Sequence, residues 1–221
     1  MTPIDDYRSR ILTILGDSTG SRYSQTQVDE ALRSALDEYS TACPANARAS
    51  FTVVIPGKRQ TISGLSHFQF FIEVQWPADP DPEVNRVKTW RSGFVDGVPQ
   101  IQFSQERPQA GDVINLVFAA GHTIDGLDEA AVTTVPPVHE SLLALGAAAH
   151  AAVARSTQIS EQLTSRVSNA TQLLTWGNDR LAEFRTILTT LALVKTNQAS
   201  PGGWTLDYWD RQLPDGMVAD F

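Results

Sequence analysis

Apolar residues recur at helical spacing near the start of the chain, in two short stripes separated by a polar loop. The first stripe is Ile4, Tyr7, Ile11 and Ile14, and the second is Val28, Leu32, Ala35 and Tyr39. Intervals of three and four residues place such side chains on one face of a helix. The second stripe follows Ser24–Gln27, whose Ser-x-x-Gln pattern is typical of a capping box at a helix start. The pattern therefore predicts a hairpin of two short amphipathic helices.

The last third of the chain predicts two longer helices. Residues 138–154 are apolar almost all round, which indicates a helix buried among other helices. Over about 159–196, apolar residues repeat at alternating intervals of four and three, as in a coiled-coil seam: Leu163, Val167, Ala170, Leu174, Gly177, Leu181, Phe184, Leu188 and Leu191. We select Leu174, Gly177, Leu181 and Phe184 as the candidate packing seam, toward another helix or another subunit. Glycine costs about 1 kcal/mol relative to alanine in a helix, so Gly177 predicts a close contact or a bend.

Between the two helical parts, several short runs rich in β-branched and aromatic residues predict strands. These runs are residues 51–55, 70–76, 86–90, 100–103 and 113–118. Asp96-Gly97 is a strong signal for a hairpin turn between two of them. Short strands at intervals of ~8–12 residues favour an antiparallel sheet or a small sandwich.

Together these elements predict an α+β fold. We expect residues 1–47 and 137–197 to form a helical bundle of two N-terminal helices and two long C-terminal helices. Residues 48–136 form an inserted antiparallel β domain, and residues 198–221 an extended C-terminal tail. Because the β region interrupts the helices, the segments before and after it must meet in space.

The predicted tail is rich in aromatic residues and shows neither a helical nor a strand period. It follows a Ser200–Gly203 linker, and its candidate partner-binding residues are Trp204, Tyr208, Trp209, Leu213 and Phe221. Exposed aromatic side chains at this density usually bury against a surface. That surface is either the bundle of the same chain or a partner, namely a neighbouring subunit or another protein.

Composition narrows the function classes. The formal net charge of −8 and the pI of about 4.9 argue against a protein that grips nucleic acid, because phosphate binding needs clustered Lys and Arg. Cys43 is the only cysteine, so no disulfide forms within the chain, and a reducing cytoplasm is the expected folding compartment. No stretch approaches the ~18 consecutive apolar residues of a membrane span, so we expect no membrane partner.

The sequence carries no motif of nucleophilic catalysis, phosphate binding or zinc binding. Its four histidines lie far apart, at His67, His122, His139 and His150. The acidic residues Asp79, Asp81 and Glu83 lack the glycine of a calcium loop. We therefore expect no catalytic residue, no cofactor and no metal, and we interpret the chain as a protein that is not an enzyme.

Three stretches carry motifs that recur together in one protein family. The first is a helix, a glycine-aspartate then aromatic-serine loop, and a second helix, in Tyr7–Leu12, Leu15–Asp17, Tyr23-Ser24 and Val28–Ser40. The second stretch runs through Ala110–Asp112, His122–Leu127 and Thr133–Pro136, and the third through Trp176 and Arg180–Arg185. In these motifs the chain resembles the head–tail adaptor, or connector, proteins of tailed bacteriophages. The resemblance spans most of the chain and says least about the tail.

The resemblance implies a structural virion protein of the neck or connector region, assembled in the host cytoplasm. It implies a homo-oligomer, a dodecameric ring below the portal protein, that extends the DNA channel and gives the tail or neck proteins their attachment platform. Genomic DNA would pass through this ring without specific binding, which suits the acidic charge balance. The aromatic tail would suit insertion into the portal.

A second interpretation is a tail-fibre or receptor-binding module, with a β domain on a helical stalk. His67, Phe68, Trp76, Trp90 and Phe94 would then line a carbohydrate-binding face, although aromatic side chains in a sheet are more often core. Such stalks are usually trimers, whereas here the seam helix follows another apolar helix, which indicates a partner within the chain. A third interpretation, a hydrolase using an Asp/Glu pair, has no support in the residue spacing.

Overall fold

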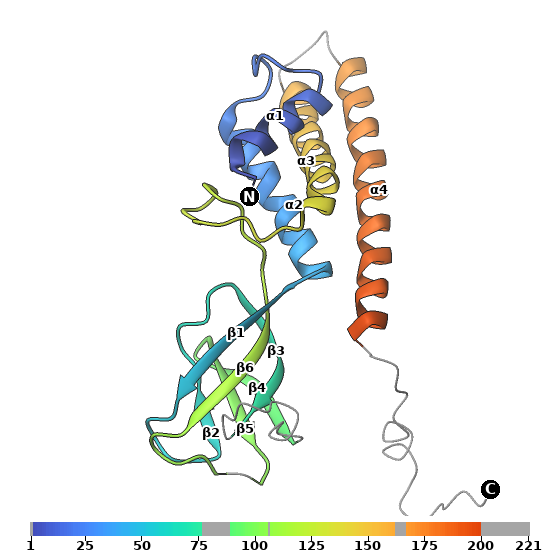
Figure 1. Ribbon diagram of the computed structural model, residues 1–221. Helices are drawn as coiled ribbons and strands as arrows, with labels where there is room; N and C mark the ends of the chain where they lie inside the picture. Colours follow the sequence, from blue (N-terminus) through green and yellow to red (C-terminus); the bar gives the residue numbers. More distant parts are fainter. Residues whose placement is uncertain (1, 77–88, 106, 162–166, 200–221) are drawn as a thin grey trace, which may run out of the picture.

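A computed structural model describes residues 2–76, 89–105, 107–161 and 167–199. Within them the chain forms a group of helices and, below it in Figure 1, a group of strands. The described residues hold four α-helices and two small antiparallel sheets, so the predicted α+β class is confirmed.

The helical part is arranged around one central helix. Its elements are α1 (Ile4–Ile14), α2 (Gln25–Ala42), the 3-10 helix η1 (Pro137–His139), α3 (Glu140–Glu161) and α4 (Val167–Ala199). Helix α3 contacts each of the other three α-helices. Its buried side chains are mostly small, namely Leu143, Ala144, Ala147, Ala148 and Ala151. Small side chains let the neighbouring helices approach closely on all sides, as the all-round apolar pattern of this segment predicts.

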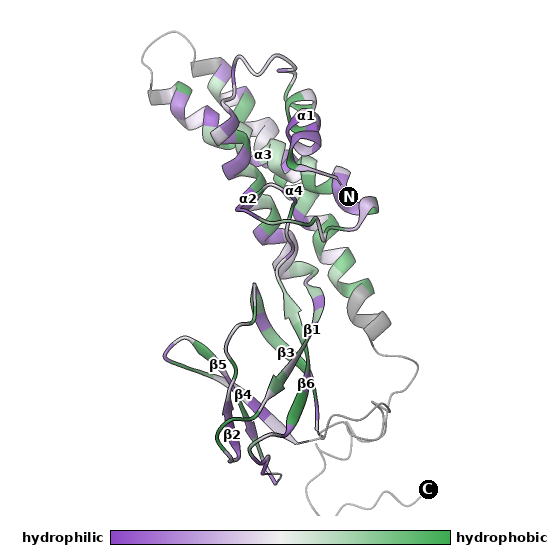
Figure 2. Cartoon of the chain, turned by 60° about the vertical axis from the view of Figure 1, so that its left-hand side comes forward, coloured by the Kyte–Doolittle hydropathy of each residue, from purple (hydrophilic) through white to green (hydrophobic). Residues whose placement is uncertain are grey.

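The strands form two three-stranded antiparallel sheets. One has the order β1 (Ala45–Thr52), β6 (Val113–Ala120), β3 (Phe68–Gln75), and the other has the order β2 (Arg59–Thr61), β5 (Val98–Phe103), β4 (Trp90–Val95). Strand β6 lies in the middle of the first sheet and is mostly apolar (Figure 2). Its side chains Ile114, Leu116 and Phe118 join Ile101 and Phe103 of β5 in one buried cluster.

The predicted turn at Asp96-Gly97 joins β4 to β5. Val95 and Val98 are paired across it, and Asp96 and Gly97 both have positive φ angles, of 51° and 78°. Two residues with positive φ are what a two-residue type I′ hairpin requires, and Asp-Gly is among its preferred sequences.

Several predicted boundaries are wrong. The strand predicted at 51–55 begins earlier and ends earlier, as β1 at Ala45–Thr52. The helix predicted to start near 159 begins only at Val167, because α3 continues to Glu161. Residues 86–88 of the strand predicted at 86–90 lie outside the described residues, and Trp90 is the first residue of β4. The short strand β2 was not predicted at all.

The loop after β6 returns to the helices. Ile124, Leu127 and Val135 are buried in the helical core together with Tyr7 of α1 and Tyr39 of α2. The loop is also hydrogen-bonded to the chain start, because the Thr133 hydroxyl donates to the carbonyl of Thr2. Packing therefore joins this loop to the bundle, while the division of the chain at 48–136 stays a prediction.

Candidate functional site

The α3–α4 interface is closest at two glycines. A Cβ on Gly146 of α3 would stand 2.8 Å from the ring of Phe184 on α4. A Cβ on Gly177 of α4 would stand 2.8 Å from Cγ2 of Val153 and 3.2 Å from the carbonyl oxygen of Ala149 on α3. Each helix thus contributes one glycine against which the other helix packs. The close contact expected at Gly177 is present, and α3 supplies it.

Three of the four predicted seam residues are covered within the chain. Gly177, Leu181 and Phe184 are buried, whereas Leu174 is 39% exposed. Other apolar side chains of α4 are also exposed, namely Ile187 at 37%, Leu193 at 62% and Val194 at 46%. The seam is therefore largely occupied by α3, and the exposed apolar side chains of α4 lie on several sides of the helix.

An ionic cluster joins α2, α3 and α4. Arg185 of α4 donates two hydrogen bonds to the carboxylate of Glu38 on α2, at 2.8 and 2.7 Å, and Nε2 of His150 on α3 lies 3.1 Å from the same carboxylate. The hydrogen bond from Arg185 lowers the pKa of Glu38. Burial lowers the pKa of His150. The cluster fixes the rotation of α4 relative to the other two helices.

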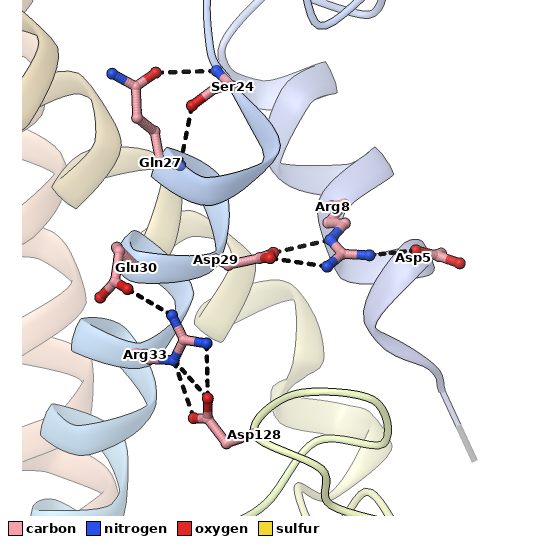
Figure 3. Close-up of polar contacts among 8 residues, drawn as sticks. All are labelled: Asp5, Arg8, Ser24, Gln27, Asp29, Glu30, Arg33 and Asp128. Atoms are coloured by element: carbon pink, nitrogen blue, oxygen red, sulfur yellow. Dashed lines mark hydrogen bonds and ion pairs between the residues drawn. The ribbon is translucent and has the colours of Figure 1, made fainter.

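Two arginines hold the N-terminal part together (Figure 3). Arg8 of α1 makes a bidentate contact with Asp29 of α2, with both N···O distances 2.8 Å. Arg33 of α2 reaches Asp128 in the loop after β6. Bidentate arginine–carboxylate pairs fix geometry as well as adding binding energy. They therefore set the positions of α1 and of this loop against α2.

The α1–α2 loop is organised by one buried carboxylate. Asp17 accepts hydrogen bonds from the backbone N–H groups of Arg22, Tyr23 and Ser21, at 2.7, 3.0 and 3.1 Å, and also from the Ser21 hydroxyl. Burial acts to raise the pKa of Asp17, but these hydrogen bonds outweigh it and lower the pKa. The glycine-aspartate and aromatic-serine motif thus has a structural role, because the hydrogen bonds that its aspartate side chain accepts all come from the loop.

Helix α2 then begins with the predicted capping box (Figure 3). The Ser24 hydroxyl accepts from the backbone N–H of Gln27 at 3.3 Å, and the Gln27 side-chain oxygen accepts from the backbone N–H of Ser24 at 2.9 Å. Two N–H groups that the helix leaves without a backbone partner are satisfied in this way. The loop and the cap together give α2 a defined start.

The chain passes twice between the helices and the strands, at Cys43–Ala45 and at Ala120–His122, and we call this region the waist. His122 joins the two passages. Its backbone N–H donates to the Ser40 hydroxyl at 2.9 Å, and its Nε2 lies 2.9 Å from the Cys43 carbonyl oxygen. The second passage is thereby hydrogen-bonded to the first.

Tyr39 connects His122 to a second histidine, His139, at the waist. The Tyr39 ring lies between the His122 and His139 rings, with centroid distances of 5.1 and 5.7 Å. The Tyr39 hydroxyl is hydrogen-bonded to Nδ1 of His139 at 2.6 Å, and burial raises the pKa of Tyr39 to about 12. His122 and His139, far from Tyr39 in the sequence, become one polar cluster that no sequence motif signals.

The remaining predicted site residues are distributed as follows. The tail residues Trp204, Tyr208, Trp209, Leu213 and Phe221 lie outside the described residues. Of the aromatic residues considered for a carbohydrate face, Phe68, Trp76 and Trp90 pack against the β core, while Phe94 is 62% exposed.

Among the residues that the structure describes, no group of three or more His, Cys, Asp or Glu side chains is placed to hold a metal ion. Within the same residues, none of the helices combines the length and the apolar character needed to cross a membrane.

Comparisons with known proteins do not identify a family for the chain. No protein-family model matches the chain, and no curated protein matches it. Among solved structures it is weakly similar to one described as "Neck of empty GTA particle computed with C6 symmetry", with 17% sequence identity over 66% of this chain and 76% of that one. The TM-score of 0.30 is too low for this likeness to carry an argument.

Proposed function

We propose that the chain is a head–tail adaptor, a structural virion protein that forms a ring below the portal and offers an attachment platform to the tail or neck. The exposed apolar surface of α4 is the observation that carries the proposal. Most of the seam of this 33-residue helix is covered by α3, yet Leu174 of the seam and Ile187 next to it remain 39% and 37% exposed. Exposed apolar side chains beside a filled interface favour a second, intermolecular one.

The motifs of the family resemblance support the same proposal through their structural roles. The glycine-aspartate loop and the segment His122–Leu127 position α1, α2 and the waist, as described above. These are the parts that hold the subunit in shape. The acidic charge balance is expected to let DNA pass along the ring without specific binding.

In this proposal the tail binds the portal or a neighbouring subunit. Tyr208, Trp209, Leu213 and Phe221 supply the buried anchors, since aromatic residues dominate binding energy at interfaces. Deleting residues 201–221 should abolish portal binding while the far-ultraviolet circular dichroism stays unchanged. Unchanged portal binding would contradict this role of the tail.

The ring is tested by measuring mass with light scattering, for the protein alone and mixed with its candidate portal. A ring near twelve subunits, or a monomer that joins the portal in equal number, is expected. A stable trimer without portal affinity would contradict the adaptor and favour the tail-fibre interpretation.

A matched pair of variants tests the surface of α4 itself. Ile187→Glu should prevent ring formation or portal joining because it places a charge in the proposed interface. Thr186→Glu, an exposed neighbour on the same helix, should leave assembly intact. Equal behaviour of the two variants would show that this side of α4 is not the interface.

A further inference from the structure

A pocket of about 580 Å³ opens at the waist, beside the C-terminal turns of α4. Its walls come from three parts of the chain: the end of α2 and start of β1, the loop after β6 with η1, and α4. The α4 wall consists of Leu191 and Val194. We call this pocket the waist pocket. Its volume lies within the ~300–1,000 Å³ range of pockets that hold small-molecule ligands, so a large side chain also has room in it.

The lining combines apolar and polar side chains. Leu191, Val194 and Pro136 are apolar, and Val194 is 46% exposed although it lines the pocket. The hydrogen-bonded Tyr39–His139 pair, His122 and Asn46 supply polar atoms. A suitable occupant has a flat apolar body with one polar edge. A tryptophan side chain has this composition, and its indole N–H needs a hydrogen-bond acceptor when buried.

The sequence places such a residue near the pocket. Helix α4 ends at Ala199, five residues beyond Val194, and Trp204 is the fifth residue after the helix. Between them lies Ser200-Pro201-Gly202-Gly203. Proline cannot continue the helix, and the two glycines permit a sharp reversal of the chain. At ~1.5 Å per helical residue, a reversed segment has to cover only about 7.5 Å to return to the level of Val194.

We propose that Trp204 of the same chain occupies the waist pocket and anchors the root of the tail to the bundle. The short connection favours the same chain over a second copy, because a tethered group binds at a high effective concentration when its linker spans the gap. Trp204 is then an internal anchor, and the residues from Tyr208 onward are left for a partner. This inference holds whether or not the protein forms a ring.

The test uses disulfide cross-linking in a Cys43→Ser background, so that only introduced thiols react. Asn46→Cys places one thiol at the pocket wall, and Thr205→Cys places the other next to an intact Trp204. Mild oxidation should give a disulfide within one chain, seen by peptide mapping and by gel mobility without reductant. The matched control pairs Asn46→Cys with Asp220→Cys at the far end of the tail. We expect the control pair to react at least several-fold more slowly.

The role of the indole is tested on the same pair. Adding Trp204→Ala should lower the cross-linking rate to that of the Asp220→Cys control, whereas adding Trp209→Ala should leave it unchanged. Equal rates for the Thr205→Cys and Asp220→Cys pairs would overturn the proposal. Covalent dimers in place of internal disulfides would overturn it too, by assigning the occupant to a second copy.

Discussion

The Phe184 ring of α4 lies where a side chain on Gly146 of α3 would begin, with three ring atoms 2.8–2.9 Å from the position of a Cβ. Both residues are buried, and Phe184 is fully so. The glycine is therefore required by its neighbour across the interface and not by its own backbone angles. This contact sets how close α3 and α4 come near the middle of α4.

Gly146→Ala should destabilise the protein by roughly 1 kcal/mol, and by no more than about 2 kcal/mol. Forcing a methyl group into a filled core costs roughly 1–3 kcal/mol, and the better helix propensity of alanine returns about 1 kcal/mol. Denaturant unfolding measures the difference. Gly93→Ala in β4, where no atom lies within 4 Å of the added Cβ, should be neutral or slightly stabilising. An unchanged or raised stability of Gly146→Ala would show that the ring moves aside freely.

Gly177→Ala should destabilise the protein, and shortening Val153 on the opposite helix should restore only part of the lost stability. Val153→Ala removes the nearest atom, Cγ2, but the Ala149 carbonyl oxygen at 3.2 Å and the Val153 nitrogen at 3.3 Å belong to the backbone and remain. We expect a loss of about 1–2 kcal/mol that Val153→Ala recovers only in part. A double-mutant cycle gives the coupling energy. Complete recovery would mean that the side chain alone makes the contact tight.

Asp17→Asn should destabilise the protein by about 1–3 kcal/mol, because the amide replaces one acceptor oxygen with a donor that faces backbone N–H groups. The carboxylate itself is almost fully buried. Thermal unfolding measures the loss. The control is Asp96→Asn in the β4–β5 turn, where asparagine tolerates the positive φ and should be close to neutral. Similar midpoints for both variants would contradict the role of Asp17 in the loop.

Glu38→Gln should cost about 0.5–1 kcal/mol at pH 7, and the cost should disappear in acid. The pKa of Glu38 is lowered in the folded protein, so its contribution is present above the usual value of 4.5 and is lost as the pH falls through the lower folded value. Unfolding free energies of both proteins between pH 7 and pH 3 should therefore converge. Glu30→Gln, in an exposed pair with Arg33, should show a smaller difference across the range. A constant gap for Glu38→Gln would exclude the ionic origin.

Features that depend on neighbours in the sequence were predictable. The capping box at Ser24 and Gln27 and the turn at Asp96-Gly97 each need only a few adjacent residues. The boundaries of β1 could not be predicted from the sequence, because Ala45–Ser50 has little strand preference of its own and becomes a strand by pairing with β6. The end of α3 was missed for a related reason. No glycine or proline lies between Arg155 and Trp176, so a helical pattern runs across the break.

The site was predictable only in part. The seam of α4 follows from its heptad spacing, and Gly177 was predicted to mark a close contact or a bend. The partner of that approach, Val153 on α3, is chosen by tertiary packing. The polar cluster at the waist could not be predicted for the same reason. Its members Tyr39, His122 and His139 come from three separate segments and share no spacing. The cross-linking and portal-binding experiments distinguish between the chain's own pocket and a partner as the binding site of the tail aromatic residues.

The hydrogen bonds of His122 at the waist have a consequence for how this protein can change over evolutionary time. They hold residue 43, where the chain leaves the helices, beside residue 122, where it comes back. A cut at these two points would leave ends that a tight turn can join. We therefore expect that the intervening strands can be shortened or replaced without moving the helices that they connect.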